Sequence, residues 1–506
     1  MKQFTGRRAA LHNLGCKVNA YETDLMTALL KEAGFEIVPF SEPADVYVIN
    51  TCSVTNIADR KSRQMIHRAR KMNPGAVVIA AGCYVQTAVD KTGLQIDADI
   101  ILGTGRKLDI VHEIEQFEER RGTDHHGETQ ERQTETGKQC RADLSVQSVV
   151  DVADLRKLGT LGTLGTPENM ALPKVEGHTR AYIKVQDGCD MYCSYCIIPY
   201  ARGHVRSRKM DDIVQELTHL AQEGTSEVVL TGIHLSSYGV DFPESTGSTW
   251  QERSRLIELV ERVAGIAGIE RIRLGSLEPT IITEETAARL SQIGKLCPHF
   301  HLSLQSGSDT VLNRMNRHYT TKEYSRCVSI LRKYFDRPAL TTDIIVGFPQ
   351  ETEQEFQETL EYLREIQLYE THIFRYSRRA GTLADRMEGQ VPEMVKARRA
   401  QVLESLNRKN QISFIAGKDG AGAEVLVEER CDASVPNAAQ QEANLSQGTG
   451  AVVKLIPDQV SADNGELVWY AGYTRDYIRV AVPSTVDIRG RIIRGSLAVE
   501  SSALLV

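Results

Sequence analysis

No apolar run in this 506-residue chain approaches the roughly 20 residues that a helix needs to span a bilayer. The first residues, MKQFTGRRAALHNLGC, contain no long apolar stretch, so no signal peptide is expected. An excess of basic residues is also absent. The net charge is −7, which excludes a uniformly basic coat for nucleic acid but allows local patches. We therefore expect a cytoplasmic protein with no membrane partner.

Cysteine, in contrast, is present ten times. In the cytoplasm such residues are metal ligands, reactive thiols or core residues more often than disulfide partners. Cys189, Cys193 and Cys196 stand together in QDGCDMYCSYCIIPYARG, spaced Cys-x3-Cys-x2-Cys. Zinc and ordinary iron–sulfur sites take four ligands. Three thiolates hold three irons of a 4Fe-4S cluster and leave the fourth open. A zinc site completed by His204, or a set of buried thiols, is the alternative.

The first part of the chain alternates short apolar strands with helical stretches. Buried parallel strands are predicted at 46–50 and 76–83, and an amphipathic helix at 20–34. This pattern predicts an open parallel α/β domain over residues 1–115. Residues 116–175 are polar and repeat Leu-Gly-Thr, which indicates a flexible linker or an insertion.

Six β-then-α units follow within residues 176–412. Their strands are RAYIKVQ, EVVLTGI, RIRLGSL, HFHLSLQ, ALTTDIIVGF and ETHIFRYS. This order predicts a partial (βα)6 TIM-like barrel with its ligands at the carboxyl ends of the strands. Residues 413–485 carry short β-rich runs that predict a small β-barrel, and residues 486–506 are expected to form a C-terminal tail.

Three further cysteines follow predicted strands of the N-terminal domain: Cys16 in NLGCKVN, Cys52 in NTCSVT and Cys83 in AAGCYVQ. Parallel strands that end on one edge of a sheet bring distant residues together. Spacing alone leaves two interpretations, one shared site or separate structural thiols. The four scattered cysteines are expected to be structural, and they are Cys140, Cys297, Cys327 and Cys431.

Taken together, these motifs resemble the radical S-adenosylmethionine methylthiotransferase family. LHNLGCKVNAYETD, INTCSVTNIADRK and AGCYVQ are similar to its N-terminal domain, and HTRAYIKVQDGCDMYCSYCIIPYARGHVRSR to its radical core. LSLQSGSDTVLNRMNRHYT and DIIVGFPQET resemble the later barrel strands, and AGYTRDYIRV resembles the RNA-binding TRAM barrel. The resemblance omits residues 116–175 and the last 20 or so. Gln350 departs from it, because the family commonly has glycine there.

The resemblance implies two 4Fe-4S clusters, with S-adenosylmethionine as a further cofactor. The radical-core cysteines would hold the cluster that passes an electron to S-adenosylmethionine. The N-terminal cysteines would hold an auxiliary cluster that carries the sulfur to be inserted. The implied contacts with S-adenosylmethionine, which ordinary strand-to-helix turns would also explain, are Tyr195, Thr231, Gly232, Ser276, Gln305, Ser306 and Gly347.

The motif flanks look most like the branch that modifies N6-threonylcarbamoyladenosine beside the anticodon of tRNA. This likeness implies the tRNA anticodon loop as a partner and a flavodoxin or ferredoxin as the reductant. Two alternatives keep the chemistry and change the target to isopentenyladenosine in tRNA or to an aspartate of a ribosomal protein. Another alternative is a non-catalytic, zinc-stabilised RNA-binding protein.

Two basic stretches favour an RNA partner: DRKSRQMIHRARK at 59–71 and YARGHVRSRK at 200–209. Such patches suit phosphate contacts, although a solvated helix face gives the same pattern. Arg378 and Arg379 are candidates to meet an acidic group of the substrate. The aromatic candidates for base stacking, or equally for a core, are Trp469, Tyr470, Tyr473 and Tyr477.

Overall fold

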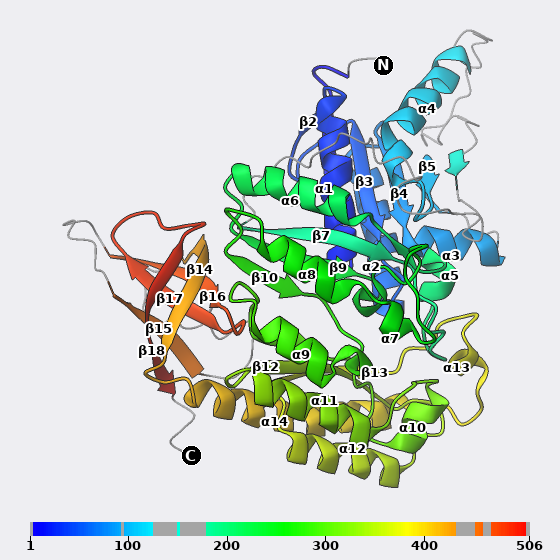
Figure 1. The fold of residues 1–506 in the computed structure, drawn as a ribbon. Helices are drawn as coiled ribbons and strands as arrows, with labels where there is room; N and C mark the ends of the chain where they lie inside the picture. Colours follow the sequence, from blue (N-terminus) through cyan, green and yellow to red (C-terminus); the bar gives the residue numbers. More distant parts are fainter. Residues whose placement is uncertain are drawn as a thin grey trace. The chain divides into compact units, whose positions relative to one another are not determined.

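The computed structural model of the protein describes residues 4–92, 96–124, 149–151, 179–431, 451–458 and 467–501 (Figure 1). The chain forms two compact units. The first comprises residues 1–172, 187–190 and 196–206, and the second comprises the rest. Across the described ranges, no helix is long and apolar enough to cross a membrane.

The first unit is built on a parallel sheet with strand order β2-β1-β3-β4-β5-β6. Its strands are β1 (Arg8–Asn13), β2 (Glu36–Ile37), β3 (Val46–Thr51), β4 (Val77–Gly82), β5 (Ile100–Leu102) and β6 (Val149–Asp151). Every residue of β3 and β4 is buried, because helices cover both faces of the sheet. This explains their continuous apolar sequence and confirms the strands predicted at 46–50 and 76–83.

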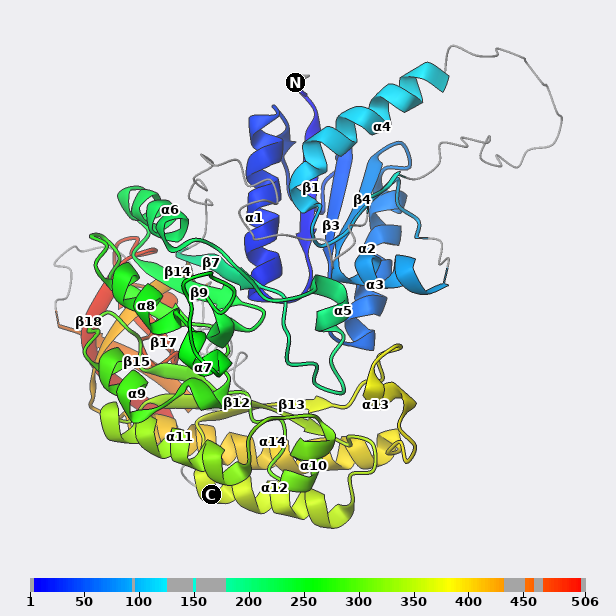
Figure 2. The same ribbon diagram turned by 45° about the vertical axis from the view of Figure 1, so that its right-hand side comes forward.

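Helices α1 (Lys17–Glu32) and α4 (Ile110–Asp124) cover one face of this sheet, and α2 (Asn56–Met72) and α3 (Cys83–Thr92) cover the other (Figure 2). A short 3-10 turn, η1 (Lys107–Asp109), precedes α4. Helix α1 confirms the helix predicted at 20–34. The chain reverses just after it at Gly34, whose φ of +101° suits glycine.

The segment predicted as a linker or insertion, 116–175, is partly structured. Helix α4 runs on to Asp124, and β6 pairs in parallel with β5. Neither feature could be predicted from apolar periodicity. The last buried apolar residue of α4 is Phe117, so the rest of the helix shows no apolar pattern. Strand β6 has three residues, which are too few to show a period. The parts of the prediction at 125–148 and 152–175 lie outside the described residues.

The second unit contains six parallel strands that match the six predicted ones. They are β7 (Arg180–Asp187), β9 (Glu227–Gly232), β10 (Arg271–Leu274), β11 (His299–His301), β12 (Ala339–Val346) and β13 (Glu370–Arg375). They form the sheets β10-β9-β7-β8 and β11-β12-β13, with β8 at Arg206–Ser207. Single bridges from Ile272 to Leu296 and from Leu277 to Leu302 connect the two sheets. The predicted partial (βα)6 barrel is confirmed.

Helices follow the strands around this barrel. The longer ones are α6 (Met210–Gln222), α8 (Leu256–Ala264), α9 (Glu284–Ser291), α11 (Thr321–Tyr334), α12 (Glu353–Ile366) and α14 (Glu393–Ala416). The shorter ones are α5 (Ile198–Arg202), α7 (Trp250–Arg253), η3 (Leu235–Ser237), η4 (Pro279–Ile281), α10 (Asp309–Arg314) and α13 (Leu383–Arg386). Capping boxes begin α11 at Thr320 and α12 at Thr352, which is why both helices start sharply.

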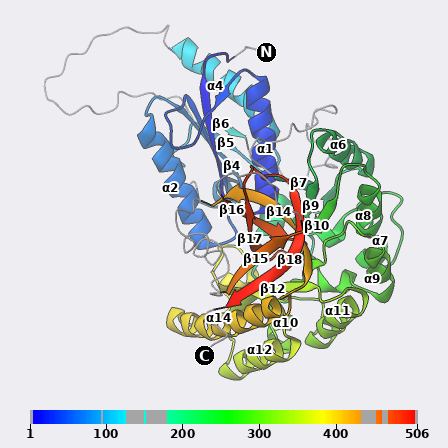
Figure 3. The same cartoon turned by 90° about the vertical axis from the view of Figure 1, so that its left-hand side faces the viewer.

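The end of the chain forms a closed barrel with strand order β14-β16-β17-β15-β18 (Figure 3). Its strands are β14 (Gly422–Arg430), β15 (Ala451–Pro457), β16 (Val468–Thr474), β17 (Arg479–Ser484) and β18 (Ile492–Ser501). The small β-barrel is thus confirmed, but the tail predicted at 486–506 is wrong as far as Ser501, because β18 pairs with β14 and β15. Gly495 interrupts the apolar pattern of β18, since a Cβ there would lie 2.1 Å from the Ile456 carbonyl oxygen.

One buried carboxylate with three arginines joins the β-barrel to the barrel core of the second unit. Glu227 lies 2.9 Å from Arg273, 3.1 Å from Arg180 and 3.3 Å from Arg271. Arg273 also donates to the carbonyl oxygen of Thr474 at 2.7 Å. Burial works to raise the pKa of Glu227, but the arginines outweigh it and the pKa is lowered. The ionised carboxylate therefore holds this junction together.

Candidate functional site

The three N-terminal cysteines lie at the amino-terminal ends of helices. Cys16 directly precedes α1, Cys52 follows β3 just before α2, and Cys83 is the first residue of α3. Free backbone N–H groups and the helix dipole give such ends partial positive charge, which favours thiolates. The sheet edge brings the three cysteines close together: Asn13 pairs with Asn50, Thr51 pairs with Gly82, and a Cβ on Gly15 would lie 2.8 Å from Sγ of Cys52.

Burial dominates the acidity of two of these thiols. It raises the pKa of Cys52 to about 11, and nearby Cys83 and Cys16 act in the same direction. Burial also raises the pKa of Cys83, whereas Cys16 is exposed. The bare thiols of Cys52 and Cys83 are therefore protonated near neutral pH, and metal binding must release their protons. A soft donor set of three neighbouring thiols, of which only Cys16 is exposed, fits an iron–sulfur cluster.

Gly15 packs directly against Cys52, so a side chain at this position should disturb the three-cysteine site. Its φ is +105°, and a Cβ there would lie 2.7 Å from Cβ and 2.8 Å from Sγ of Cys52. We expect Gly15→Ala to displace Cys52 and to lower the iron bound per chain after anaerobic reconstitution. Gly6→Ala is the matched control, because Gly6 also has a positive φ, +84°, but no atom within 4 Å of its Cβ position. Equal iron loss in both variants would contradict this account.

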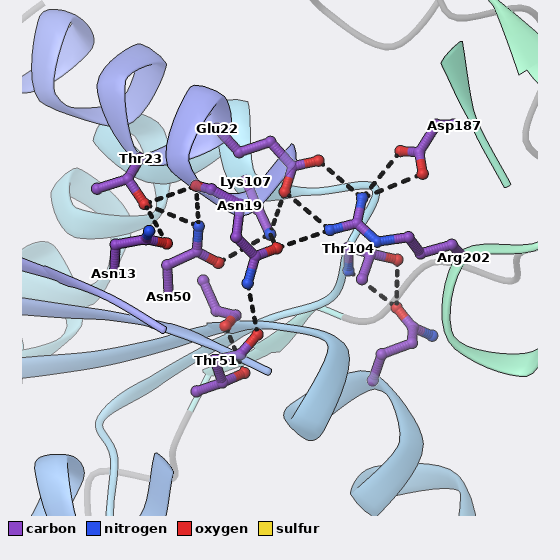
Figure 4. A network of polar contacts seen from close by, with 12 residues as sticks. Asn13, Asn19, Glu22, Thr23, Asn50, Thr51, Thr104, Lys107, Asp187 and Arg202 are labelled. Carbon is purple, nitrogen blue, oxygen red and sulfur yellow. Dashed lines mark hydrogen bonds and ion pairs between the residues drawn. The ribbon is translucent and has the colours of Figure 1, made fainter. Parts of the chain in front are cut away.

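Figure 4 shows a polar network in the first unit. Its Lys107 Nζ would lie 3.2 Å from a Cβ on Gly82, the residue before Cys83. Arg202 donates to Glu22 at 2.9 Å and to Asp187 at 3.1 Å, and Lys107 donates to Asn50 at 2.8 Å. All five side chains belong to the first unit and are buried. The network fixes the spacing between α1, β3 and the segment after β7.

The radical-core cysteines lie in one loop between β7 and α5, each of them partly buried. Within the first unit, the backbone N–H of Cys189 donates to the carbonyl oxygen of Gly203 at 3.0 Å. Within the second unit, Arg317 donates to Sγ of Cys193 at 3.2 Å. His204, the fourth ligand of the zinc alternative, has its Nδ1 2.6 Å from a carboxylate oxygen of Asp190.

Arg317 belongs to a buried polar group that sequence reasoning missed. Besides Cys193, it donates to Glu278 at 2.6 Å. Arg317 and His234 lower the pKa of Glu278, against burial, which works to raise it. Among the residues that the structure describes, buried Glu278 Oε1 has no hydrogen-bond partner, and buried His234 Nε2 lies 3.8 Å from Glu278 Oε2, beyond hydrogen-bond distance. These unsatisfied atoms beside a cluster cysteine fit a polar ligand such as S-adenosylmethionine. Glu278 directly follows the predicted strand RIRLGSL, and Arg317 lies within LSLQSGSDTVLNRMNRHYT, but neither was predicted to take part in the site.

The residues predicted to contact S-adenosylmethionine occupy or follow the carboxyl ends of the strands, apart from Tyr195. Tyr195 packs against the buried cluster around Phe348. Ser276 is exposed after β10, and Gln305 has a φ of +72°. Ser306 is buried with its Oγ 3.3 Å from Thr359 Oγ1, so its hydroxyl secures the turn toward α12.

The other predicted contacts are backbone positions at strand ends. Thr231 and Gly232 end β9, and a Cβ on Gly232 would lie 2.8 Å from Oε1 of Gln186. Gly347 has a φ of +72° and donates its N–H to Glu351 at 2.6 Å. Gln350 adopts a φ of +65°, which explains why the family commonly has glycine there.

The second basic stretch, 200–209, is mostly not available for RNA. Arg202 and Arg206 are buried, and Arg208 pairs with Glu216 at 2.7 Å. The prediction of phosphate contacts is therefore wrong for Arg202 and Arg206, whose charges serve buried carboxylates. Lys209 is exposed.

The first basic stretch keeps its charges at the surface of α2. Arg70 pairs with Asp99 at 2.8 Å. The exposed cations, which we call the α2 basic face, are Arg60, Lys61, Arg63, Arg68 and Lys71. This arrangement is compatible both with a phosphate-binding surface and with a solvated helix.

Most of the aromatic residues considered for base stacking are packed inside the protein. Tyr470 is 4% exposed within the β-barrel core. Tyr477 accepts a hydrogen bond from Arg180, whose guanidinium also lies 5.3 Å from the ring of Tyr473. Trp469 is partly buried against Cys431.

The two arginines proposed to meet the substrate also differ in exposure. Arg378 is exposed and pairs with Asp385 at 2.9 Å. Arg379 is buried. Only the first therefore presents its guanidinium at the surface.

The comparisons with known proteins agree with this geometry. The model described as "Radical SAM superfamily" matches residues 183–363, and the model described as "Uncharacterized protein family UPF0004" matches residues 8–103. A solved structure, the radical S-adenosylmethionine methyltransferase TsrM from Kitasatospora setae, has the same fold with a TM-score of 0.50 at 14% identity, covering 76% of this chain and 77% of that one.

Curated relatives extend the likeness over nearly the whole chain. The threonylcarbamoyladenosine tRNA methylthiotransferase MtaB of Bacillus subtilis is 36% identical over 485 residues, which are 96% of this chain and 92% of that protein. The tRNA-2-methylthio-N(6)-dimethylallyladenosine synthase of Acetivibrio thermocellus is 33% identical, covering 84% of this chain and 82% of the other.

The barrel and its three-cysteine loop define a radical S-adenosylmethionine enzyme, which uses a 4Fe-4S cluster and S-adenosylmethionine. Within that class, the chain belongs to the radical S-adenosylmethionine methylthiotransferase family.

Proposed function

We propose that the protein attaches a methylthio group to C2 of N6-threonylcarbamoyladenosine beside the anticodon of tRNA. The observation that carries this proposal is the near full-length likeness to MtaB of Bacillus subtilis, together with two separate three-cysteine sets. The reaction would take place in the cytoplasm, with a flavodoxin or ferredoxin as electron donor.

The two cysteine sets have different tasks in this proposal. Cys189, Cys193 and Cys196 would hold a 4Fe-4S cluster that would supply an electron for the cleavage of S-adenosylmethionine, and the N-terminal cysteines would hold a second cluster that would supply the sulfur. Glu278 would accept hydrogen bonds from hydroxyl or ammonium groups of S-adenosylmethionine through its unsatisfied Oε1. Arg317 would hold both Glu278 and the Cys193 side chain in place.

RNA binding is assigned to the TRAM-like β-barrel and to the α2 basic face. We expect a triple variant, Arg60→Gln, Lys61→Gln and Arg68→Gln, to bind the anticodon stem-loop more weakly. If each cation meets one phosphate, the slope of log affinity against log salt falls by about 2. Fluorescence anisotropy at several salt concentrations measures this. Lys322→Gln with Arg326→Gln on α11 is a control with exposed cations elsewhere, and an equal loss there would contradict the assignment.

Mass spectrometry of nucleosides tests the function itself. In a strain that lacks this gene and has no second such enzyme, the methylthio derivative of threonylcarbamoyladenosine should vanish and return with the wild-type gene. The proposed substrate is wrong if that nucleoside persists. Loss of the isopentenyladenosine derivative, or of a methylthio-aspartate in a ribosomal protein, would then identify the substrate instead. If the purified and reconstituted protein binds zinc and no iron, the proposed enzymatic function is wrong.

A further inference from the structure

The proposed chemistry does not use the buried charge network of the first unit that Figure 4 shows. Lys107 Nζ lies 2.5 Å from Glu22, and Arg202 lies 2.9 Å from the same carboxylate and 3.1 Å from Asp187. None of these four side chains is more than 6% exposed. Ion pairs of this depth are expensive to desolvate, so their presence calls for an explanation.

The network carries more positive than negative charge. Among the described residues of the network, the buried cations are Lys107, Arg202 and Arg206, and the buried carboxylates are Glu22 and Asp187. An uncompensated buried charge is strongly unfavourable unless an opposite charge lies nearby. The surplus therefore indicates an anionic group beside the network.

Part of this positive charge lies beside Cys83. A Cβ on Gly82, the residue before Cys83, would lie 3.2 Å from Lys107 Nζ. Lys107 is therefore close to one of the predicted ligands.

The same network reaches the second buried cysteine through Asn19. Its side-chain oxygen accepts from Arg202 at 2.7 Å, and its amide nitrogen donates to the carbonyl oxygen of Thr51 at 3.0 Å. Thr51 directly precedes Cys52. Arg202 is thus tied to the backbone beside Cys52, and Lys107 lies near the backbone that precedes Cys83.

We propose that Lys107 and Arg202 are positioning residues that supply the counter-charge for an iron–sulfur cluster on the N-terminal cysteines and thereby raise its reduction potential. This inference rests on the proposed function, which assigns that cluster. A 4Fe-4S cluster with three thiolate ligands is anionic, and reduction adds a further negative charge. Buried cations stabilise the reduced form more than the oxidised form, because water screens them weakly.

The test uses the full-length chain in which Cys189, Cys193 and Cys196 are all alanine, so that only the N-terminal cluster forms. After anaerobic reconstitution, iron per chain and a redox titration followed by electron paramagnetic resonance are measured. Lys107→Met should move the potential to more negative values, and Glu22→Gln should move it to more positive values. Lys71→Met, on the exposed face of α2, should leave it unchanged.

Lys107→Met and Glu22→Gln both loosen the packing of the same network, so an effect of packing would shift the reduction potential in the same direction in both variants. An effect of charge shifts it in opposite directions. Shifts of one sign, or no shift, would overturn the inference. If Lys107→Met binds no iron, retention of iron by Glu22→Gln supports the counter-charge role and loss from both variants overturns it. Failure of the background protein itself to bind iron would instead refute the N-terminal cluster of the proposed function.

Discussion

Cys83→Ala is expected to abolish methylthio transfer and to leave the reductive cleavage of S-adenosylmethionine intact, whereas Cys193→Ala should abolish both. The reason is the separation of the ligands: Cys83 begins α3 at the edge of the N-terminal sheet, and Cys193 lies in the loop after β7. Each variant should lose about four of about eight irons per chain, because each removes a ligand from one 4Fe-4S cluster.

Three measurements on the anaerobically reconstituted protein check this prediction: iron content, 5′-deoxyadenosine formed after reduction, and methylthio-nucleoside by mass spectrometry. Cys327→Ala is the matched control, because Cys327 is buried in α11 and belongs to neither set. If Cys83→Ala transfers the methylthio group at the wild-type rate, the N-terminal cysteines have no role in the reaction and the prediction is wrong.

Glu227→Gln should lower the free energy of unfolding of the second unit by about 3–5 kcal/mol. The reason is that it leaves three buried arginines without their shared carboxylate. Two of these, Arg271 and Arg273, donate to backbone carbonyls of the β-barrel, so its docking should weaken first. The chain has two tryptophans, and Trp469 lies in β16. Fluorescence of Trp469 in a Trp250→Phe background during urea denaturation would follow this step.

The matched control for this substitution is Glu261→Gln, which removes an exposed carboxylate 2.8 Å from Arg289 and should cost at most about 1 kcal/mol. The pH dependence gives a second check. Because the pKa of Glu227 is lowered in the folded protein, its stabilisation is complete above the ordinary glutamate range and is lost as the pH falls through the lowered pKa. The difference between wild type and Glu227→Gln should therefore shrink in acid. A constant difference down to low pH would contradict the ion-pair account.

The strand rhythm in the sequence was sufficient to predict β3 and β4 of the first unit and the six barrel strands. These features depend on local apolar runs and on a general rule, that parallel strands end on one edge. The role of Arg202 could not be predicted in this way. In YARGHVRSRK it reads as a surface cation, and only the tertiary contacts with Glu22 and Asp187 show it to be buried.

Two other features escaped prediction for related physical reasons. β18 closes the β-barrel through long-range antiparallel pairing, and a glycine within it interrupts the apolar pattern. Arg317 lies beyond the end of α10, far in sequence from Glu278 and Cys193, which it contacts. Sequence periodicity reports the face that a residue occupies, but it does not report its partner from another element.

The burial of Arg202 has a consequence for the modularity of the protein. The first unit is discontinuous: residues 187–190 and 196–206 complete it from beyond residue 115. A fragment that ends at residue 115 would keep Cys16, Cys52 and Cys83 but would lack Arg202. The N-terminal domain is therefore not a self-sufficient module that can be excised or exchanged, and recombination between relatives should preserve the loop after β7 together with it.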